Sequence, residues 1–305
     1  MRILLVGQAA FAEKVFEGLV GAGDEVAAVV CPPDKGDKLD PVKASALGRG
    51  IPVHQFASLK RPEARAAFEQ AAADLALLAY VTQIVPETLL HVPRLGTLCF
   101  HPSLLPKYRG GSAIPWQLIR GETRTGVTVF WTDAGIDTGP LLLQREATAG
   151  PDDTAGTLYY QTLFPLGVQT CVDAVGLVRG GNALRVPQDE RLATYDPLLT
   201  DAHAAIDWAQ PARTLHDLIR GCDPSPGAHT SWEGKRLRLY EPRRTSERAA
   251  SAPPGTVVAI DADGLAVATA DGIVRCKRLR ADGPKATASE VAAAVGLGAG
   301  ARLGS

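Results

Sequence analysis

Two side chains near the middle of the chain, His101 and Asp137, have the chemistry needed to move protons at neutral pH. Histidine has an unperturbed pKa of about 6.5, so it can take up and release a proton under physiological conditions. A carboxylate close to the ring favours its charged form and can also orient a nucleophile. Either residue alone is more often structural, as a strand-end histidine or a turn aspartate. Both residue types are nevertheless suited to acid–base catalysis, which makes the two residues candidates.

Both candidates lie between Gly96 and Gln144, a stretch that is dense in short motifs. The apolar run Thr97–Phe100 predicts a strand that delivers His101 to the edge of a sheet. Asp137 lies in the loop DAGIDTG, whose glycines permit tight backbone turns. A pair of adjacent glycines and one further loop lie between the two candidates, and that loop consists of Ser103, Leu104, Leu105 and Pro106.

These motifs resemble those of the 10-formyltetrahydrofolate-dependent formyltransferase family. The shared segments are HPSLLP, SAIPW, FWTDAGIDTG, LLLQ, PDDT, LFP and IRGCDPSPGA. The resemblance covers essentially all 305 residues. Within the family, the motifs are most similar to the hydrolase domain of the 10-formyltetrahydrofolate dehydrogenases.

The resemblance implies an enzyme that removes the formyl group from 10-formyltetrahydrofolate and releases tetrahydrofolate. The acceptor would be water, which gives formate, or a small amine or a carrier thiol. His101 would polarise the formyl oxygen or shuttle the proton, while Asp137 would orient and activate the acceptor. The resemblance also implies a set of residues along the folate donor, namely Gln83, Ile84, Val85, Ser103, Leu104, Leu105 and Pro106, together with Asp137.

One position departs from the pattern of the amine formyltransferases. Those enzymes carry Asn-x-His, in which the asparagine amide assists at the formyl oxygen, whereas this chain has Cys99 two residues before His101. A thiol is a weak donor, and loss of one good oxyanion donor costs ~3–4 kcal/mol of barrier in other enzymes. The hydrolase domain also lacks the asparagine. Cys99 is either a small buried hydrophobe or a catalytic residue that carries a transient S-formyl group.

Charge and glycine pattern argue against other classes of partner and cofactor. The 32 basic and 33 acidic residues give a net charge of -1, and the early loop Pro32–Lys43 is short and balanced in sign, which argues against tRNA. The turn after the first apolar run lacks G-x-G-x-x-G, which argues against a nicotinamide cofactor. The alternatives are an amine N-formyltransferase, acting on methionyl-tRNA or a sugar, and a non-catalytic folate-binding regulator.

Cysteine and histidine spacing predicts no metal. The five cysteines form no CxxC pair, and the six histidines show no paired ligand spacing. The N-terminus lacks the layout of a signal peptide, and no apolar run approaches the ~20 residues that span a bilayer. We therefore expect a cytoplasmic protein that holds its cysteines as reduced thiols, mainly in the core.

The elements that position the candidates follow an α/β pattern in the first part of the chain. Apolar runs alternate with helical patterns, which predicts a doubly wound, mostly parallel, Rossmann-like sheet. The predicted strands are residues 2–7, 25–31, 52–56, 74–80, 97–100, 126–132 and 139–144, and a long helix is predicted over 155–178.

The last part of the chain has a different pattern, with short strand-like runs between Gly, Asp and Pro turns. The runs are residues 236–240, 255–260, 264–268 and 272–278, and they predict a small open β-barrel similar to that of the family. We expect a catalytic domain over 1–185, a transition over 186–207 and the barrel domain over 208–305. The Ala- and Gly-rich tail after Val295 is expected to fray.

Overall fold

The computed structural model describes residues 1–245 and 252–304. The chain forms two compact units, each described here by itself. The first unit comprises Met1–Gly111, Gly126–Ala147 and Gln161–Asp196, and the remaining described residues belong to the second. The boundaries expected from the sequence, at residues 185 and 208, stay a prediction.

The first unit is built on a sheet in the order β3-β2-β1-β4-β5-β6-β7. Strands β1 to β5 run parallel, and β5 pairs antiparallel with β6. The strand order reverses between β1 and β4, and open α/β sheets bind ligands at the carboxyl ends of strands beside such a switch point. The strands are β1 (Arg2–Gly7), β2 (Glu25–Cys31), β3 (Val53–Gln55), β4 (Leu75–Ala79), β5 (Thr97–His101), β6 (Arg124–Trp131) and β7 (Leu141–Thr148).

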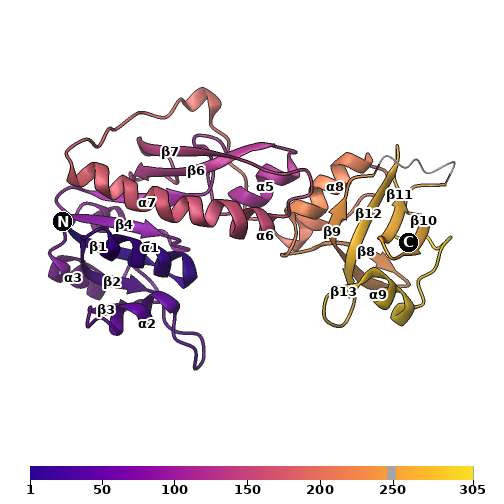
Figure 1. Ribbon diagram of the computed structural model, residues 1–305, viewed down its shortest axis with the longest axis horizontal. Coiled ribbons are helices and arrows are strands. Elements are labelled where there is room, and N and C mark those ends of the chain that lie inside the picture. Colours follow the sequence, from indigo (N-terminus) through magenta and orange to yellow (C-terminus); the bar gives the residue numbers. More distant parts are fainter. Residues whose placement is uncertain (246–251, 305) are drawn as a thin grey trace. The chain divides into compact units, whose positions relative to one another are not determined.

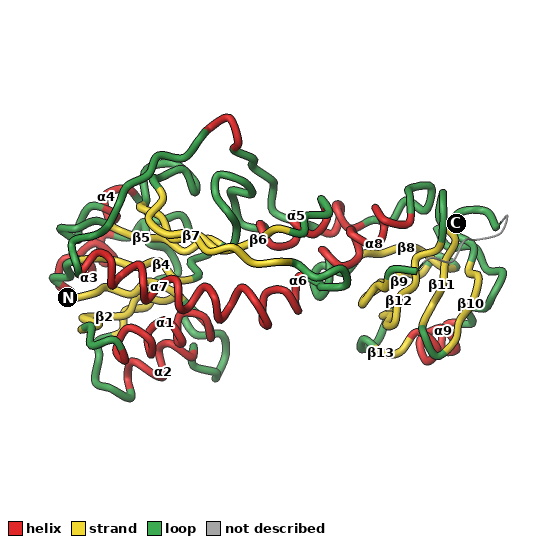
Figure 2. Tube along the Cα trace, turned by 45° about the horizontal axis from the view of Figure 1, so that its top comes forward, coloured by secondary structure: helices red, strands yellow, loops and turns green. Residues whose placement is uncertain are grey.

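Helices cover both faces of this sheet, because β4 and all of β1 after Arg2 are apolar and buried and need partners on each side. On one face α1 and α7 pack side by side (Figures 1 and 2). On the other face, α3 and α4 contribute Phe68 and Leu89 to a cluster with Leu4 and Val6 of β1. The helices are α1 (Ala9–Gly21), α2 (Pro41–Leu47), α3 (Pro62–Ala71), α4 (Glu87–Leu90) and α7 (Phe164–Arg179).

The second unit contains an antiparallel sheet in the order β10-β11-β12-β9-β8, with β13 paired to β12. Apolar side chains of α8 and α9, such as Leu215 and Val291, complete its core. Its elements are α5 (Ala113–Ile119), α6 (Ala155–Thr157), α8 (Ala212–Gly221), β8 (Ala228–Trp232), β9 (Lys235–Arg243), β10 (Val257–Asp261), β11 (Gly264–Ala268), β12 (Ile273–Arg280), β13 (Ala286–Thr287) and α9 (Ala288–Val295). The predicted fold class, a doubly wound sheet followed by a small C-terminal β unit, is confirmed.

The long helix predicted over residues 155–178 is confirmed, although it is not α-helical throughout. The structure has α6, a π-helical segment over Leu158–Leu163, and then α7. Pro165 lies in the first turn of α7. Because proline has no backbone N–H, it cannot donate to the preceding turn, and the wider π-helical segment falls where that hydrogen bond is missing.

The predicted fraying after Val295 is wrong for the described residues. Leu297 and Leu303 are buried in the core of the second unit. The Leu303 N–H donates to the Gly255 carbonyl, so the tail pairs with the chain before β10. Strand β8 escaped prediction because its AHTSW sequence has no apolar run.

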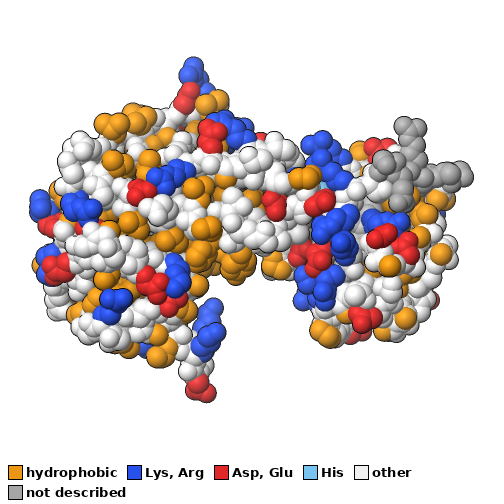
Figure 3. All heavy atoms as spheres, in the orientation of Figure 1, with side chains coloured by type: hydrophobic (Ala, Val, Ile, Leu, Met, Phe, Trp, Pro, Cys, Tyr) orange, Lys and Arg blue, Asp and Glu red, His pale blue; other side chains and the backbone are white. Residues whose placement is uncertain are grey.

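Strand β7 runs Leu141–Thr148, beyond the predicted end at residue 144. Arg145 and Glu146 extend it, because only alternate side chains of the strand are shielded from water. Charges of both signs are scattered over the face of the molecule in Figure 3, as the balanced composition predicts. Within 1–245 and 252–304, the helices are all too short or too polar for a bilayer crossing.

Gly167 of α7 lies against the aromatic ring of Phe100 in β5, next to His101. A Cβ atom at this glycine would lie 2.6 Å from the Phe100 ring and 3.0 Å from the Phe11 ring. We expect Gly167→Ala to lower the free energy of unfolding by about 1–3 kcal/mol, because a methyl group overpacks this contact. Urea denaturation followed by circular dichroism measures the change.

Gly176 of the same helix provides the matched control, since a Cβ there meets nothing closer than the Arg179 guanidinium at 3.8 Å. We expect Gly176→Ala to raise the stability by up to ~1 kcal/mol, because alanine favours helix more than glycine does. Equal effects of the two substitutions would contradict the packing explanation.

Candidate functional site

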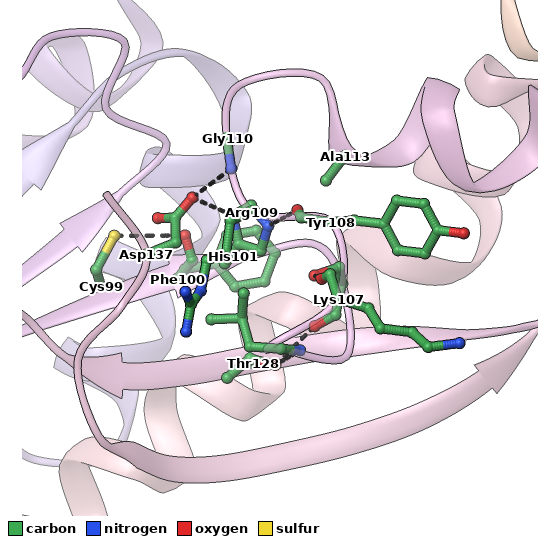
Figure 4. A network of polar contacts seen from close by, with 12 residues as sticks. Cys99, Phe100, His101, Lys107, Tyr108, Arg109, Gly110, Ala113, Thr128 and Asp137 are labelled. Carbon is green, nitrogen blue, oxygen red and sulfur yellow. Dashed lines mark hydrogen bonds and ion pairs between the residues drawn. The ribbon is translucent and has the colours of Figure 1, made fainter. Parts of the chain in front are cut away.

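His101 is the last residue of β5, and only 5% of its surface is exposed. Its Nε2 lies 2.7 Å from the backbone oxygen of Tyr108 (Figure 4). A carbonyl oxygen can only accept a hydrogen bond, so Nε2 carries a proton. The other ring nitrogen, Nδ1, faces the Asp137 carboxylate, with Oδ2 at 3.4 Å. The structure thus brings together the two residues that the sequence predicts as a pair.

Asp137 lies in the loop between β6 and β7 and has a left-handed backbone, with φ of 57°. Its Oδ2 accepts a hydrogen bond from the Gly110 N–H at 2.8 Å (Figure 4). Within the loop, the Asp133 carboxylate accepts from the Gly135 N–H. Gly139 closes the loop against β6, because a Cβ there would lie 1.8 Å from the Trp131 carbonyl oxygen. Aspartate tolerates the left-handed region better than most residues, which fits its place here.

The contacts of the His101 ring give its two nitrogens different roles. Nε2 uses its proton on the Tyr108 oxygen. Nδ1 is the nitrogen that faces the Asp137 carboxylate, at 3.4 Å from Oδ2. Any proton that passes between the two side chains therefore passes between Nδ1 and Oδ2.

Cys99 precedes this pair in β5 and remains a thiol at neutral pH. Its Sγ donates weakly to the Phe100 carbonyl, at 3.5 Å. Burial raises the pKa of the Cys99 thiol well above its usual value, and the Asp137 carboxylate raises that pKa further. The side chain packs against the apolar cluster of β1, β4, α3 and α4, although the residue keeps some contact with solvent. These properties favour the interpretation of Cys99 as a packing residue.

The loop from Ser103 to Pro106 is fixed mainly through its backbone. Thr128 of β6 donates to the Ser103 carbonyl at 2.6 Å and accepts from the Leu105 N–H at 3.3 Å. Gln144 of β7 donates to the Leu105 carbonyl at 2.7 Å. The Ser103 and Leu105 side chains are buried, whereas Leu104 and Pro106 are partly exposed. The loop therefore offers a ligand its backbone and the latter two side chains.

In the loop after β4, Gln83 to Val85, the polar side chain is engaged by neighbouring backbone. The Gln83 amide accepts from the Leu59 N–H at 3.1 Å and donates to the Phe56 carbonyl at 3.3 Å. Val85 packs against the apolar cluster. Ile84 is the exposed member, with 72% of its surface accessible. Gln83 is thus engaged in holding the loop, and Ile84 is available for apolar contact.

A mainly apolar hollow lies at the carboxyl ends of β1, β2 and β4. It is shallow and open to solvent. Of the residues predicted to line the folate, only Gln83 borders it. Gly7 at its base packs on β4, since a Cβ there would lie 2.1 Å from the Ala79 carbonyl oxygen. The hollow is lined by Val6, Gly7, Gln8, Val30, Cys31, Pro32, Phe56, Leu59, Tyr80, Val81, Thr82 and Gln83.

His101 and Asp137 are both potential metal ligands, and a metal site would need further ligands beside them. Over residues 1–245 and 252–304, no three or more His, Cys, Asp or Glu side chains are grouped so as to hold a metal ion.

Sequence reasoning missed the residues that hold the Asp137 loop from outside. Gln188 donates to the Asp137 carbonyl at 2.8 Å, across 51 residues of chain. Arg109 binds Gln188 and forms an ion pair with Glu190, with a shortest distance of 2.7 Å. Thr194 accepts from the Arg109 N–H at 2.9 Å. These residues lie in a polar, turn-rich segment, whose composition gives no signal of a role in a site.

The raised pKa of Cys99 predicts slow alkylation. The thiolate is the reactive form, so we expect iodoacetamide at pH 8 to modify native Cys99 at least about tenfold more slowly than free cysteine. Peptide mass mapping over time measures the rate. Asp137→Asn removes a charge that raises the pKa of this thiol, so it should accelerate the modification. Rapid alkylation of Cys99 in the native protein would contradict the assignment of a protonated thiol.

Comparisons with known proteins match the family that the motifs indicate. The sequence model described as "Formyl transferase" matches residues 1–175, and that described as "Formyl transferase, C-terminal domain" matches residues 198–295. The cytosolic 10-formyltetrahydrofolate dehydrogenase of Mus musculus is 42% identical over 245 residues, which cover 79% of this chain and 27% of that protein. The methionyl-tRNA formyltransferase of Geobacter metallireducens is 37% identical, over 100% of this chain and 99% of that protein.

Solved structures share the fold at low sequence identity. HypX from Aquifex aeolicus, in complex with tetrahydrofolic acid, has a TM-score of 0.69 at 20% identity, covering 96% of this chain and 47% of that one. An N-formyltransferase from Helicobacter canadensis, in complex with folinic acid and dTDP-3-aminofucose, also has a TM-score of 0.69, at 16% identity over 90% of this chain and 98% of that one.

These relatives include both dehydrogenases and a methionyl-tRNA formyltransferase, so they do not identify one formyl acceptor. The chain spans 27% and 31% of the lengths of two of the dehydrogenases that it matches. It matches a methionyl-tRNA formyltransferase from end to end, so the expectation that tRNA is not a partner is unconfirmed. The resemblance inferred from the motifs is confirmed: the chain belongs to the formyl transferase family.

Proposed function

We propose that this protein removes the formyl group from 10-formyltetrahydrofolate and releases tetrahydrofolate. The observation that carries the proposal is the buried pair of His101 Nδ1 and Asp137 Oδ2, 3.4 Å apart, at the carboxyl end of β5. Family membership and the names of the relatives support the choice of a formyl group and a folate donor. The donor would lie along the loops of Ile84 and of Leu104 and Pro106.

Asp137 is suited to activate the acceptor. Its Oδ2 is engaged by Gly110 and faces His101, whereas Oδ1 has no hydrogen-bond partner among the residues that the structure describes. In our proposal Oδ1 orients a water molecule, and the carboxylate takes its proton as the water oxygen bonds to the formyl carbon. The carbonyl electron pair moves onto the formyl oxygen and gives a tetrahedral intermediate.

His101 is suited to manage the proton of the second step. Nε2 is occupied by the Tyr108 oxygen, so proton exchange runs through Nδ1. In our proposal the charged ring stabilises the oxyanion, and the pair supplies the proton to N10 of the folate as the carbon–nitrogen bond breaks. With water as acceptor the step gives tetrahydrofolate and formic acid, which loses its proton to solvent and becomes formate, and the enzyme returns to its starting charge.

Cys99 bears on the choice between water and an amine. The protonated thiol is a weak donor, and it occupies the position where amine formyltransferases carry an asparagine amide. This supports hydrolysis as the first candidate. Transfer to the amine of methionyl-tRNA is the second candidate, because a methionyl-tRNA formyltransferase matches the whole chain at 37% identity. A cytoplasmic location stays a prediction for either function.

The proposal predicts large losses of turnover when either member of the pair is removed. We expect His101→Ala and Asp137→Asn each to lower kcat by roughly 10²–10⁴-fold, the usual contribution of a general acid or base. The rate is measured as tetrahydrofolate release, followed by absorbance, with 10-formyltetrahydrofolate as the one formyl donor in the assay. His91→Ala serves as control, because its side chain is 68% exposed and pairs only with Glu87 on the surface. Near-native turnover by either site variant would remove that residue from the mechanism.

The acceptor is decided by the products formed from 10-formyltetrahydrofolate in buffer without amines or thiols. If water is the acceptor, we expect one formate for each tetrahydrofolate over many turnovers. Turnover that requires added methionyl-tRNA, and that leaves the formyl group on the amine, would replace hydrolysis by transfer. No tetrahydrofolate release with any of these acceptors would refute the proposed function.

A further inference from the structure

Gln188 uses every polar position of its side-chain amide at the Asp137 loop. Nε2 donates to the Asp137 carbonyl at 2.8 Å and to the Gly139 carbonyl at 2.7 Å. Oε1 accepts from Arg109 Nη2 at 2.8 Å. Carbonyls only accept and a guanidinium only donates, so a single orientation of the amide satisfies all three partners. The glutamine therefore bridges the loop and the arginine in one defined way.

Arg109 is fixed in turn by Glu190. The guanidinium is almost fully buried, and its Nη1 and Nη2 lie 2.9 Å and 2.7 Å from the two Glu190 oxygens. Such a two-point contact defines direction as well as distance. The hydrogen bonds from Arg109 hold the pKa of Glu190 below its usual value, so this carboxylate stays charged at neutral pH. The chain of contacts therefore ends on a stable ion pair.

The Asp137 loop needs such a support, because side-chain packing does not supply one. The residues before Asp137 are exposed, including Ile136 with 46% of its surface accessible. Asp137 itself has a left-handed backbone, with φ of 57°. Aspartate tolerates this conformation better than most residues but still favours the β and right-handed regions, so contacts from outside the loop help to hold it. The two hydrogen bonds from Gln188 reach the carbonyl of Asp137 itself and that of Gly139, two residues later.

We propose that Gln188, held by Arg109, is a positioning residue that sets the Asp137 carboxylate opposite His101 without touching the substrate. The effect on catalysis rests on the proposed function, whereas the effect on the loop does not. Gln188→Glu keeps the shape of the side chain but removes both donors and turns a negative oxygen toward the two carbonyls. Gln188→Ala removes the bridge altogether, and Arg109→Lys keeps the charge but loses the two-point contact.

Hydrogen exchange of the Gly110 amide reports directly on the position of the Asp137 carboxylate. In the wild type this N–H donates to Asp137 Oδ2, and exchange slows when such a bond is formed. We expect both Gln188 variants to speed this exchange by on the order of tenfold, and Arg109→Lys to speed it less. Gln169→Ala is the matched control, since that side chain bonds only Asp173 on the exposed side of α7. It should leave the exchange unchanged.

Kinetics then test the consequence for catalysis. A displacement of a catalytic group by about 1 Å can cost on the order of 10²-fold in rate. We therefore expect the two Gln188 variants to show a kcat for tetrahydrofolate release that is lower by roughly 10- to 100-fold. KM for the donor should stay within about threefold, because a positioning residue does not bind substrate. Thermal unfolding checks that each variant is folded. If Gln188→Ala does not fold, the test uses Gln188→Glu.

The outcomes separate the two proposals. Unchanged Gly110 exchange in the folded Gln188 variants would overturn the positioning role, whatever the kinetics show. Faster exchange with unchanged kcat would overturn it too, and so would equal losses of kcat and donor binding. If the wild type does not turn over 10-formyltetrahydrofolate, the proposed function fails, and the exchange result alone still decides whether Gln188 positions Asp137.

Discussion

The backbone of residues 108–110 contacts both members of the acid–base pair, and their arrangement depends on it. The Tyr108 carbonyl accepts from His101 Nε2, and two residues later the Gly110 N–H donates to Asp137 Oδ2. Both residues have left-handed backbones, with φ of 61° and 102°. A side chain at Gly110 would strain this turn, and its Cβ would approach the Asp196 carbonyl to 3.1 Å. One short turn thus sets the ring and the carboxylate relative to each other.

This turn is held by residues far away in the chain. Thr194 bonds both the Tyr108 N–H and the Arg109 N–H. The Arg109 side chain continues through Gln188 to the Asp137 loop. The segment that includes Gln188 and Thr194 therefore stabilises the turn and the loop at once. Its place in the first unit follows from these bonds, since its own sequence is polar and exposed.

The carboxylate that faces the His101 ring is that of Asp137, with Oδ2 at 3.4 Å from Nδ1. Its negative charge opposes a thiolate at Cys99 and contributes to the raised pKa of that thiol. Burial of the histidine at the end of β5 limits the access of water to its ring. Such a low-dielectric setting strengthens the attraction between the two groups. A neutral thiol is compatible with this balance, whereas a thiolate is not.

The sequence by itself determined the α/β class, and the family resemblance of its motifs pointed to His101 and Asp137. Continuous apolar runs specify strands buried on both faces, and short motifs carry the chemistry of the site locally. It could not show the π-helical segment before α7, because Pro165 acts on the hydrogen bonds of the turn before it. It gave no sign of Gln188 and Arg109, because each acts through single hydrogen bonds to distant backbone. Only the tertiary structure decides such contacts, since they depend on where the chain returns and not on any periodicity of its residues.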